Sequence, residues 1–224
     1  MPVPPALHPF AGATLLVTPR SPFARRVRVA FREAGLPHEE RVVDVFHPDE
    51  ALLRANPLGR VPALVLTSGH ALVEAQLILD RFWAALEPAP WWPTDPAARL
   101  VADRTSGLAQ GLCELAVTLL LEGQRDPAQQ DAALVAEARA GVARALVEAE
   151  RLLCAAPHGP APSAGAAAWL TGEAPGACDF DLGVALTYLS FRVSPAWRGD
   201  HPRLAEFVDV LEARPTFAAT RPVA

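Results

Sequence analysis

A proline-rich segment between residues 87 and 93 is the feature that most limits how this chain folds. Its sequence is EPAPWWP, and its prolines end any helix or strand that reaches it. Before it, short apolar runs alternate with helical patterns; after it, the sequence is rich in Ala and Leu at helical spacing. The sequence therefore predicts two domains, residues 13–87 and 97–224, joined by a linker over 88–96.

The first of these domains alternates strand-like and helix-like segments. Ser21-Pro22 is a strong helix start, because a hydroxyl cap precedes a proline at the first helical position. Two apolar runs on either side of Ser68-Gly69-His70 indicate a hairpin. We expect strands at Thr14–Val17, Arg41–Val45, Val61–Leu66 and Ala71–Val73, with helices beginning at Pro22, Pro48 and Glu74. Such an order is typical of an α/β domain with a mixed four-stranded sheet.

The sequence beyond the linker is predicted to be all-helical. Its apolar residues recur at helical spacing, and it has little of the alternation of β-branched and polar residues that marks strands. We expect helices over Ala97–Glu122, Pro127–Cys154, Cys178–Ser190 and Pro202–Ala213, with a Pro- and Gly-containing loop over Ala155–Ala168.

Charge and residue usage exclude several classes of function. The net charge of −5 argues against a nucleic-acid partner and against a polybasic membrane anchor. All 20 cationic side chains are Arg, which excludes lysine chemistry such as Schiff bases or a phosphate-loop lysine. The cysteines Cys113, Cys154 and Cys178 are too widely spaced for a zinc cluster or a disulfide framework, and the histidines show no metal-binding spacing.

The hydrophobic fraction of 51% is enough to build a sizeable core. The longest apolar stretches are shorter than the roughly 18 residues that span a bilayer. The N-terminal residues lack a positive region followed by an apolar core, so a secretory signal is not expected. We therefore expect a soluble cytoplasmic protein with no membrane partner, no nucleic-acid partner and no metal.

Four segments together resemble one protein family. They are Ser21–Ala30 (SPFARRVRVA), Asn56–Leu64 (NPLGRVPAL), Leu72–Glu74 (LVE) and Ala177–Leu182 (ACDFDL). With them the chain resembles the cytosolic glutathione S-transferases, and within that family the bacterial serine-type members, over residues 15 to 222. The resemblance implies a thioredoxin-like N-terminal domain, an α-helical C-terminal domain and a homodimer. It also implies conjugation of glutathione, as a co-substrate, to small-molecule electrophiles, which is a detoxification reaction.

The resemblance makes Ser21 the catalytic residue, as a hydrogen-bond donor to the glutathione sulfur and not as a nucleophile. A free thiol has a pKa of about 8.5, and lowering it by two units needs about 2.7 kcal/mol of preference for the thiolate. One hydrogen bond to a charged group supplies roughly 1.5–3 kcal/mol, and a helix N-terminus adds about 0.3–1 kcal/mol. The alternative is that Ser21 is an ordinary N-cap. Because capping uses a lone pair and thiolate binding uses the O–H, one oxygen can serve both roles.

The segment before the third predicted strand also has implied roles. In the family the proline matched by Pro62 is cis, and Val61 would bind the cysteinyl part of glutathione through its main-chain atoms. Arg60, just before it, would meet the glycine carboxylate of glutathione. The alternatives are that Pro62 simply begins an edge strand and that Arg60 is a solvated surface residue.

Glu74 and Ala75 are the place where the sequence departs from the family pattern. The family usually has an acidic residue followed by Ser at this helix start, where the pair holds the γ-glutamyl group. Glu74 matches and would bind the ammonium group of glutathione, although a carboxylate near a helix start is also favourable by itself. Ala75 lacks the hydroxyl, which costs about 1.5–3 kcal/mol or about ten- to 150-fold in affinity, while its N–H remains as an anion donor. We therefore expect weak glutathione binding.

The remaining expectations concern structure and the alternative functions. Asp179, three residues after the Gly176 cap, is expected to stabilise a helix start and not to act in catalysis. Phe82, Trp83 and Leu86 lie on an apolar helix face that can pack against a partner. A catalytically weak or inactive binding module for a ligand or a protein remains an alternative function, favoured by Ala75. A glutathione-dependent reductase or isomerase is a further alternative, disfavoured by serine in place of cysteine at residue 21.

Overall fold

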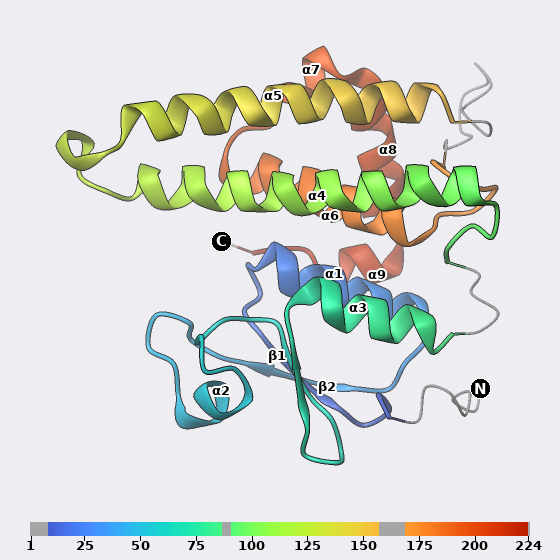
Figure 1. Ribbon diagram of the computed structural model, residues 1–224. Coiled ribbons are helices and arrows are strands. Elements are labelled where there is room, and N and C mark those ends of the chain that lie inside the picture. The colour runs from blue at the N-terminus through green and yellow to red at the C-terminus, as the bar shows by residue number, and fades with distance from the viewer. Residues whose placement is uncertain (1–8, 87–90, 157–168, 224) are drawn as a thin grey trace. The chain divides into compact units, whose positions relative to one another are not determined.

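The computed structural model describes residues 9–86, 91–156 and 169–223 and is shown as a ribbon in Figure 1. The contacts between residues form two units, Met1–Trp91 together with Pro215–Ala224, and Trp92–Arg214. The predicted linker lies partly outside the described residues, because it includes residues 88–90. The sequence pattern places the C-terminal segment in the helical domain, whereas its contacts lie in the first unit, through the short helix α9 (Pro215–Ala218) and its buried Phe217.

The first unit is built on a mixed four-stranded sheet with strand order β2-β1-β3-β4. Strand β1 pairs in parallel with β2 and antiparallel with β3, and β3 forms an antiparallel hairpin with β4. This is the thioredoxin-like arrangement that was expected, with helix α1 connecting the two parallel strands. The elements are β1 (Thr14–Val17), α1 (Pro22–Glu33), β2 (Glu39–Val42), α2 (Glu50–Ala55), β3 (Ala63–Val65), β4 (Ala71–Val73) and α3 (Ala75–Ala84).

Strand β2 begins and ends earlier than the apolar pattern predicts. The structure has it at Glu39–Val42, where the sequence suggests Arg41–Val45. Its register is set by pairing with β1, in which Thr14 lies beside Glu39. β2 is an edge strand whose side chains are mostly exposed, so it tolerates charged residues that an apolar pattern does not detect.

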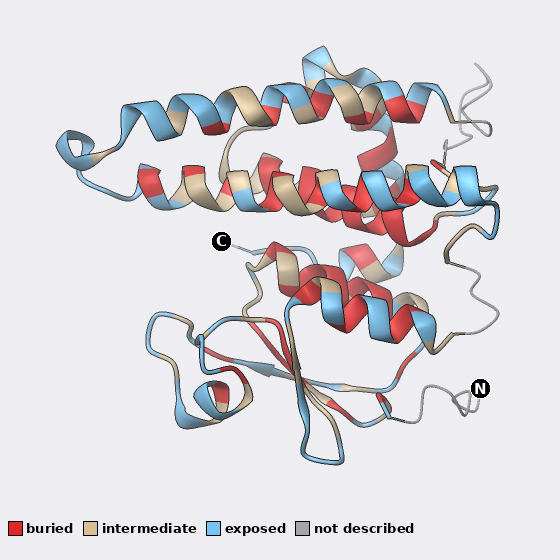
Figure 2. Ribbon diagram, in the orientation of Figure 1, coloured by how far each residue is buried: buried red, intermediate tan, exposed pale blue. Residues whose placement is uncertain are grey.

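Helices cover both faces of the sheet, with α2 on one side and α1 and α3 on the other (Figure 1), and Figure 2 shows buried residues in the strands and in these helices. On one face, Leu16, Val43, Leu52 and Ala63 form a buried cluster that fixes α2 against the sheet. Leu15 alternates with Leu16 and is buried on the opposite face. The central strand β1 is therefore apolar on both sides, as expected for a strand between two helical layers.

Helices α1 and α3 pack together on that opposite face around a group of aromatic rings. The ring centroids of Phe31 and Phe82 are 4.6 Å apart, and Phe10 meets Phe82 edge-on at 5.7 Å. Trp83 is also buried, with its ring 5.1 Å from that of Phe82. Phe82 and Trp83 thus form the core of their own unit. For Phe82 and Trp83 the expectation of a face presented to a partner is wrong, because other rings of the same unit already cover them. Leu86 is half-buried, and its part of that expectation stays a prediction.

Helix α1 is also joined to strand β2 by charged groups. Arg28 and Arg32 both form ion pairs with Glu40, at 2.8 and 3.0 Å. Partial burial raises the pKa of Glu40, but hydrogen bonds from His38 and Arg28 outweigh it and hold that pKa well below its usual range. This cluster anchors the middle and end of α1 to the edge of the sheet.

The second unit consists of helices α4 (Pro96–Gly123), α5 (Ala132–Cys154), α6 (Ala177–Arg192), α7 (Trp197–Asp200) and α8 (Pro202–Glu212), with a 3-10 turn at Pro127–Gln129. Helix α6 packs against α4 and α8 and is buried over most of its length, as Figure 2 shows. The helix predicted from Pro127 begins only at Ala132, because Asp131 caps it through the N–H groups of Ala133 and Leu134. Residues 157–168 of the predicted loop lie outside the described residues.

Asp179 caps the start of α6, as the sequence suggests. One carboxylate oxygen accepts from the N–H of Gly176 at 2.8 Å, and the other accepts from the N–H of Leu170 at 3.0 Å. Burial raises the pKa of Asp179 to about 6, against the opposing effect of these hydrogen bonds. The residue is therefore part of the internal structure of the helical unit.

Within the described parts of the chain, no helix is long and apolar enough to cross a membrane. Nor does any group of three His, Cys, Asp or Glu side chains in those parts have an arrangement that would bind a metal ion.

Candidate active site

Strand pairing brings three segments of the first unit to the same end of the sheet. Ala63, the first residue of β3, pairs with Leu16 of β1 and with Val73, the last residue of β4. The segment before β3, the residue after β4 and the loop between β1 and α1 therefore begin at this end of the sheet. The candidate residues of these segments are Ser21, Arg60, Val61, Pro62, Glu74 and Ala75.

Ser21 is the N-cap of α1, and this part of the prediction is confirmed. Its backbone is extended (φ −74°, ψ 123°), and its Oγ accepts a 3.2 Å hydrogen bond from the N–H of Ala24. Its carbonyl oxygen accepts the first helical bond, from the N–H of Arg25 at 3.0 Å. Because Oγ accepts through a lone pair, its own O–H proton remains able to donate to a ligand at the positive end of α1.

The Val61-Pro62 peptide bond is cis, as the resemblance implies. Pro62 is buried and Val61 is half-buried, immediately before β3. Arg60 is exposed, and its side chain extends from the same segment. These three residues therefore lie at the end of the sheet from which the loop to Ser21 also leaves.

Asn56 organises this segment, a role that the sequence analysis did not assign to it. It is buried, its side-chain N–H donates to the carbonyl oxygen of Arg60 at 2.9 Å, and its side-chain oxygen accepts from the N–H of Leu58 at 3.1 Å. Between these partners the chain turns at Gly59, whose φ of +64° favours glycine. The Asn-Pro-Leu-Gly motif is the sequence signal from which this role could be predicted, because an Asn side chain commonly forms hydrogen bonds with the backbone of its own turn.

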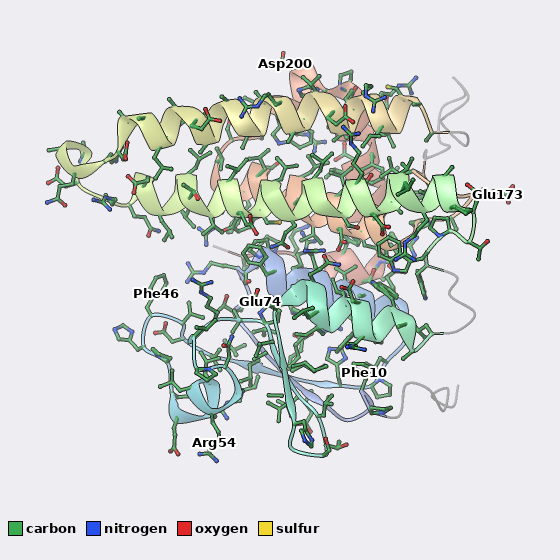
Figure 3. All side chains as sticks on the ribbon, in the orientation of Figure 1. Phe10, Phe46, Arg54, Glu74, Glu173 and Asp200 are labelled. Atoms are coloured by element: carbon green, nitrogen blue, oxygen red, sulfur yellow. The ribbon has the colours of Figure 1, made fainter. Side chains whose placement is uncertain are left out.

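Glu74 has the only positive φ among the non-glycine residues that the structure describes, at +69°. It occupies the N-cap position of α3, where Figure 3 labels it, and its exposed side chain makes no capping bond to that helix. Ala75 follows as the first residue of α3 and is buried. A strained backbone that presents an unused carboxylate beside a helix N-terminus is more typical of a binding site than of a cap.

Arg26 and Gln76 are two further residues that the sequence analysis missed. Arg26 is almost fully buried at the start of α1 and donates a 2.9 Å hydrogen bond to the side-chain oxygen of Gln76, next to Ala75 on α3. In the sequence, the signal for Arg26 is an arginine among the apolar residues of one helix face. The helical spacing of apolar residues does not show what such an arginine binds. This bond joins the starts of the two helices that border the site.

Comparison with known proteins agrees with this geometry. The family model for the glutathione S-transferase N-terminal domain matches residues 15–90. The uncharacterized GST-like protein YibF of Escherichia coli (strain K12) is 28% identical over 204 residues, which cover 90% of this chain and 95% of YibF. A glutathione S-transferase from Methylobacterium radiotolerans JCM 2831, crystallised with glutathione sulfonate, superposes with a TM-score of 0.84 at 33% identity and covers 96% of each chain. A glutathione S-transferase from Methylobacillus flagellatus KT with glutathione bound has a TM-score of 0.83 at 28% identity, covering 95% of this chain and all of that one.

The fold is thus that of a two-domain protein with a thioredoxin-like domain followed by a helical domain. On the strength of the domain match and of the similarity that extends over nearly the whole chain, the protein belongs to the glutathione S-transferase family.

Proposed function

We propose that this protein is a glutathione transferase of the serine type, which conjugates glutathione to small electrophiles. The observation that carries the proposal is the position of Ser21, a hydroxyl at the positive end of α1 whose O–H is not consumed by its capping bond. Crystal structures of two similar proteins contain glutathione or glutathione sulfonate, which supports glutathione as the ligand.

Ser21 would stabilise the thiolate form of glutathione by donating its O–H to the sulfur. A hydrogen bond to a charged group contributes roughly 1.5–3 kcal/mol, and a partly buried helix N-terminus contributes up to ~2 kcal/mol. Together these match the about 2.7 kcal/mol needed to lower a thiol pKa by two units. The thiol proton leaves to solvent, the sulfur lone pair forms the new carbon–sulfur bond, and the leaving group of the electrophile departs with the electron pair of the bond that breaks.

The other candidate residues would hold the tripeptide in place. The backbone N–H and C=O of Val61 would pair with the cysteinyl residue of glutathione, and Arg60 would meet its glycine carboxylate. The carboxylate of Glu74 would bind the ammonium group, and the N–H of Ala75 at the start of α3 would bind the γ-glutamyl carboxylate. This assignment gives a use to the exposed Glu74 side chain, which does not cap α3.

Glutathione turnover with an activated aryl halide tests the proposal. The Ser21→Ala variant should lower kcat/KM by about ten- to 150-fold, the value of one hydrogen bond to a charged group, and should raise the apparent pKa of the reaction. Ser21→Thr, which keeps a hydroxyl, should recover part of the activity. Turnover that is unchanged in Ser21→Ala would rule out the role of Ser21.

Loss of the helix cap must be separated from loss of the thiolate donor. Ser21→Ala also removes a cap worth about 1 kcal/mol of stability. Asp95→Ala removes a cap from α4, in the other unit, where the Asp95 carboxylate likewise accepts one hydrogen bond, from the N–H of Ala98 at 2.8 Å, and it provides the matched control. We expect similar losses of stability in the two variants and loss of activity in Ser21→Ala alone.

Ala75 favours a second candidate function, a binding module with the transferase fold. Without the serine hydroxyl, the γ-glutamyl end of glutathione has one hydrogen bond fewer, and a ligand bound weakly at this end is poorly positioned. Calorimetric titration separates the candidates: glutathione binding at millimolar affinity or tighter supports the enzyme, and no binding supports the module. For either function we propose a homodimer in the cytoplasm. Sedimentation equilibrium measures the mass of the assembly directly and so tests the homodimer.

A further inference from the structure

The last residues of the chain fold back onto α1, the helix that begins at Ser21. Phe217, in α9, is fully buried, and Thr220 just beyond it is 1% exposed, although both lie near the end of the sequence. Both belong to the first unit, and Figure 1 shows α9 beside α1. The burial of these two side chains shows that the segment is packed against the first unit.

Arg25 makes these contacts from the first turn of α1. Its Nη2 donates to the carbonyl oxygen of Phe217 at 3.0 Å, and its Nε donates to Oγ1 of Thr220 at 3.3 Å. The guanidinium carbon lies 5.2 Å from the centre of the Phe217 ring, within the range of a cation–π contact. Because the Arg25 side chain is only 2% exposed, water does not replace these partners.

Arg25 is connected directly to Ser21 through the backbone. Its N–H donates the first hydrogen bond of α1, to the carbonyl oxygen of Ser21 at 3.0 Å. The side chain of Arg25 is fixed at its far end by the C-terminal segment, so the first turn of α1 is held from both sides. A displacement of that turn would move the Ser21 hydroxyl, and misplacement by about 1 Å lowers catalytic rates strongly.

We propose that the C-terminal segment 215–223 is a strap and that Arg25 is a positioning residue, through which the strap fixes the start of α1 and the Ser21 hydroxyl. The inference rests on the proposed function only for its effect on catalysis; the mechanical coupling of strap to helix is independent of it. The strap also reaches the other end of α1, where Oγ1 of Thr216 donates to the carboxylate of Glu33.

These two threonines provide a matched pair of variants. Thr220→Val removes the hydroxyl that accepts from Arg25 in the first turn of α1, together with its donation to the carbonyl oxygen of Thr216 within the segment. Thr216→Val removes the hydroxyl that donates to Glu33 in the last turn of α1. Both changes keep the shape of the side chain and lie in the same segment. A strap that only adds general stability would accelerate exchange along the whole of α1 in Thr220→Val, and not at its first turn alone.

Backbone hydrogen exchange by NMR measures the coupling without any assay of activity. In Thr220→Val we expect the amides of Ala24 and Arg25 to exchange about fivefold faster, equivalent to about 1 kcal/mol for one lost hydrogen bond. In Thr216→Val we expect those two amides to be unchanged. Equal acceleration in both variants, or none in Thr220→Val, would overturn the proposal.

Catalysis gives the second readout. In Thr220→Val the pH profile of kcat should shift to higher pH, because the thiolate is less well stabilised, while the KM for glutathione changes less than kcat. Thr216→Val should keep the wild-type profile. If Thr220→Val does not fold, Arg25→Lys tests the same contacts, since a lysine keeps the charge but not the planar fork that binds both oxygens. If the wild-type protein shows no turnover, the proposed function fails, whereas the exchange experiment still decides whether the strap exists.

Discussion

The guanidinium of Arg26 on α1 donates a 2.9 Å hydrogen bond to the side-chain oxygen of Gln76 on α3. The amide nitrogen of Gln76 in turn donates to the carboxylate of Asp80 at 2.8 Å, which fixes the orientation of the amide. Arg26 is buried, so this bond forms where water is scarce. It joins the helix that begins at Ser21 to the helix that begins at Ala75, and thus links the two halves of the candidate glutathione site.

Gln76→Ala should weaken both the fold and the site. Leaving a buried guanidinium without this acceptor costs about 1–3 kcal/mol in the free energy of unfolding, which chemical denaturation measures. Glutathione affinity should fall in the same variant, because the N–H of Ala75 moves with the start of α3. Gln76→Glu keeps an acceptor for Arg26 and is the control, with a smaller loss of affinity. Stability within about 0.5 kcal/mol of wild type in Gln76→Ala would show that the link is unimportant.

Ala75→Ser should tighten glutathione binding. The added hydroxyl can donate to the γ-glutamyl carboxylate, and a hydrogen bond to a charged group is worth about tenfold to 150-fold in affinity. Ala75→Cys has a side chain of similar shape with a much weaker donor, and it should leave the affinity near that of wild type. Isothermal titration calorimetry of wild type, Ala75→Ser and Ala75→Cys measures the three glutathione affinities. Tightening in the Cys variant equal to that in the Ser variant would contradict the hydrogen-bond explanation.

Glu74→Gly should raise stability and lower glutathione affinity at the same time. At φ +69° a side chain costs about 1–2 kcal/mol, which exceeds the roughly 0.5–1 kcal/mol of backbone entropy that glycine adds to the unfolded chain. Loss of the carboxylate removes the partner of the ligand ammonium group. Glu74→Gln keeps the strained backbone and removes only the charge, so it should lower affinity with stability unchanged. A Glu74→Gly variant that is less stable than wild type and binds glutathione normally would show that Glu74 is structural.

The parts of this fold that the sequence predicts are those encoded by neighbouring residues. Ser21-Pro22 specifies the start of α1 because the cap, the proline and the first turn lie within four residues, and Asp179 specifies the start of α6 in the same way. Strand β1 is found at its predicted bounds because an apolar run of this kind is typical of a central strand. Local chemistry is sufficient in each of these cases.

The contacts that the sequence does not reveal connect distant residues. Arg25 meets Thr220 across 195 residues, and Arg26 meets Gln76 across 50. From helical spacing alone, an arginine is predicted to lie on the surface. Only the three-dimensional structure shows that Arg25 is buried beside the C-terminal segment and that Arg26 is buried beside α3. For the same reason the pattern assigns Phe217 to the helical domain, although its contacts lie in the first unit.

Asp179→Ala should destabilise the protein by an amount that depends on pH. Removing the carboxylate leaves the N–H groups of Gly176 and Leu170 without their acceptor, which costs about 2–4 kcal/mol.

Burial raises the pKa of Asp179 to about 6, from a value near 3.8 in the unfolded chain. The folded protein therefore holds a proton that the unfolded chain has lost between about pH 4 and pH 6, so this group's contribution to stability falls as the pH rises through that window. The difference in unfolding free energy between wild type and Asp179→Ala should thus be larger at pH 4.5 than at pH 7.5, by about 2 kcal/mol. Titrations in other parts of the protein cancel in this difference, and urea denaturation at the two pH values measures it. A difference that is independent of pH would mean that the carboxylate stays ionised throughout, and that its two hydrogen bonds outweigh its burial.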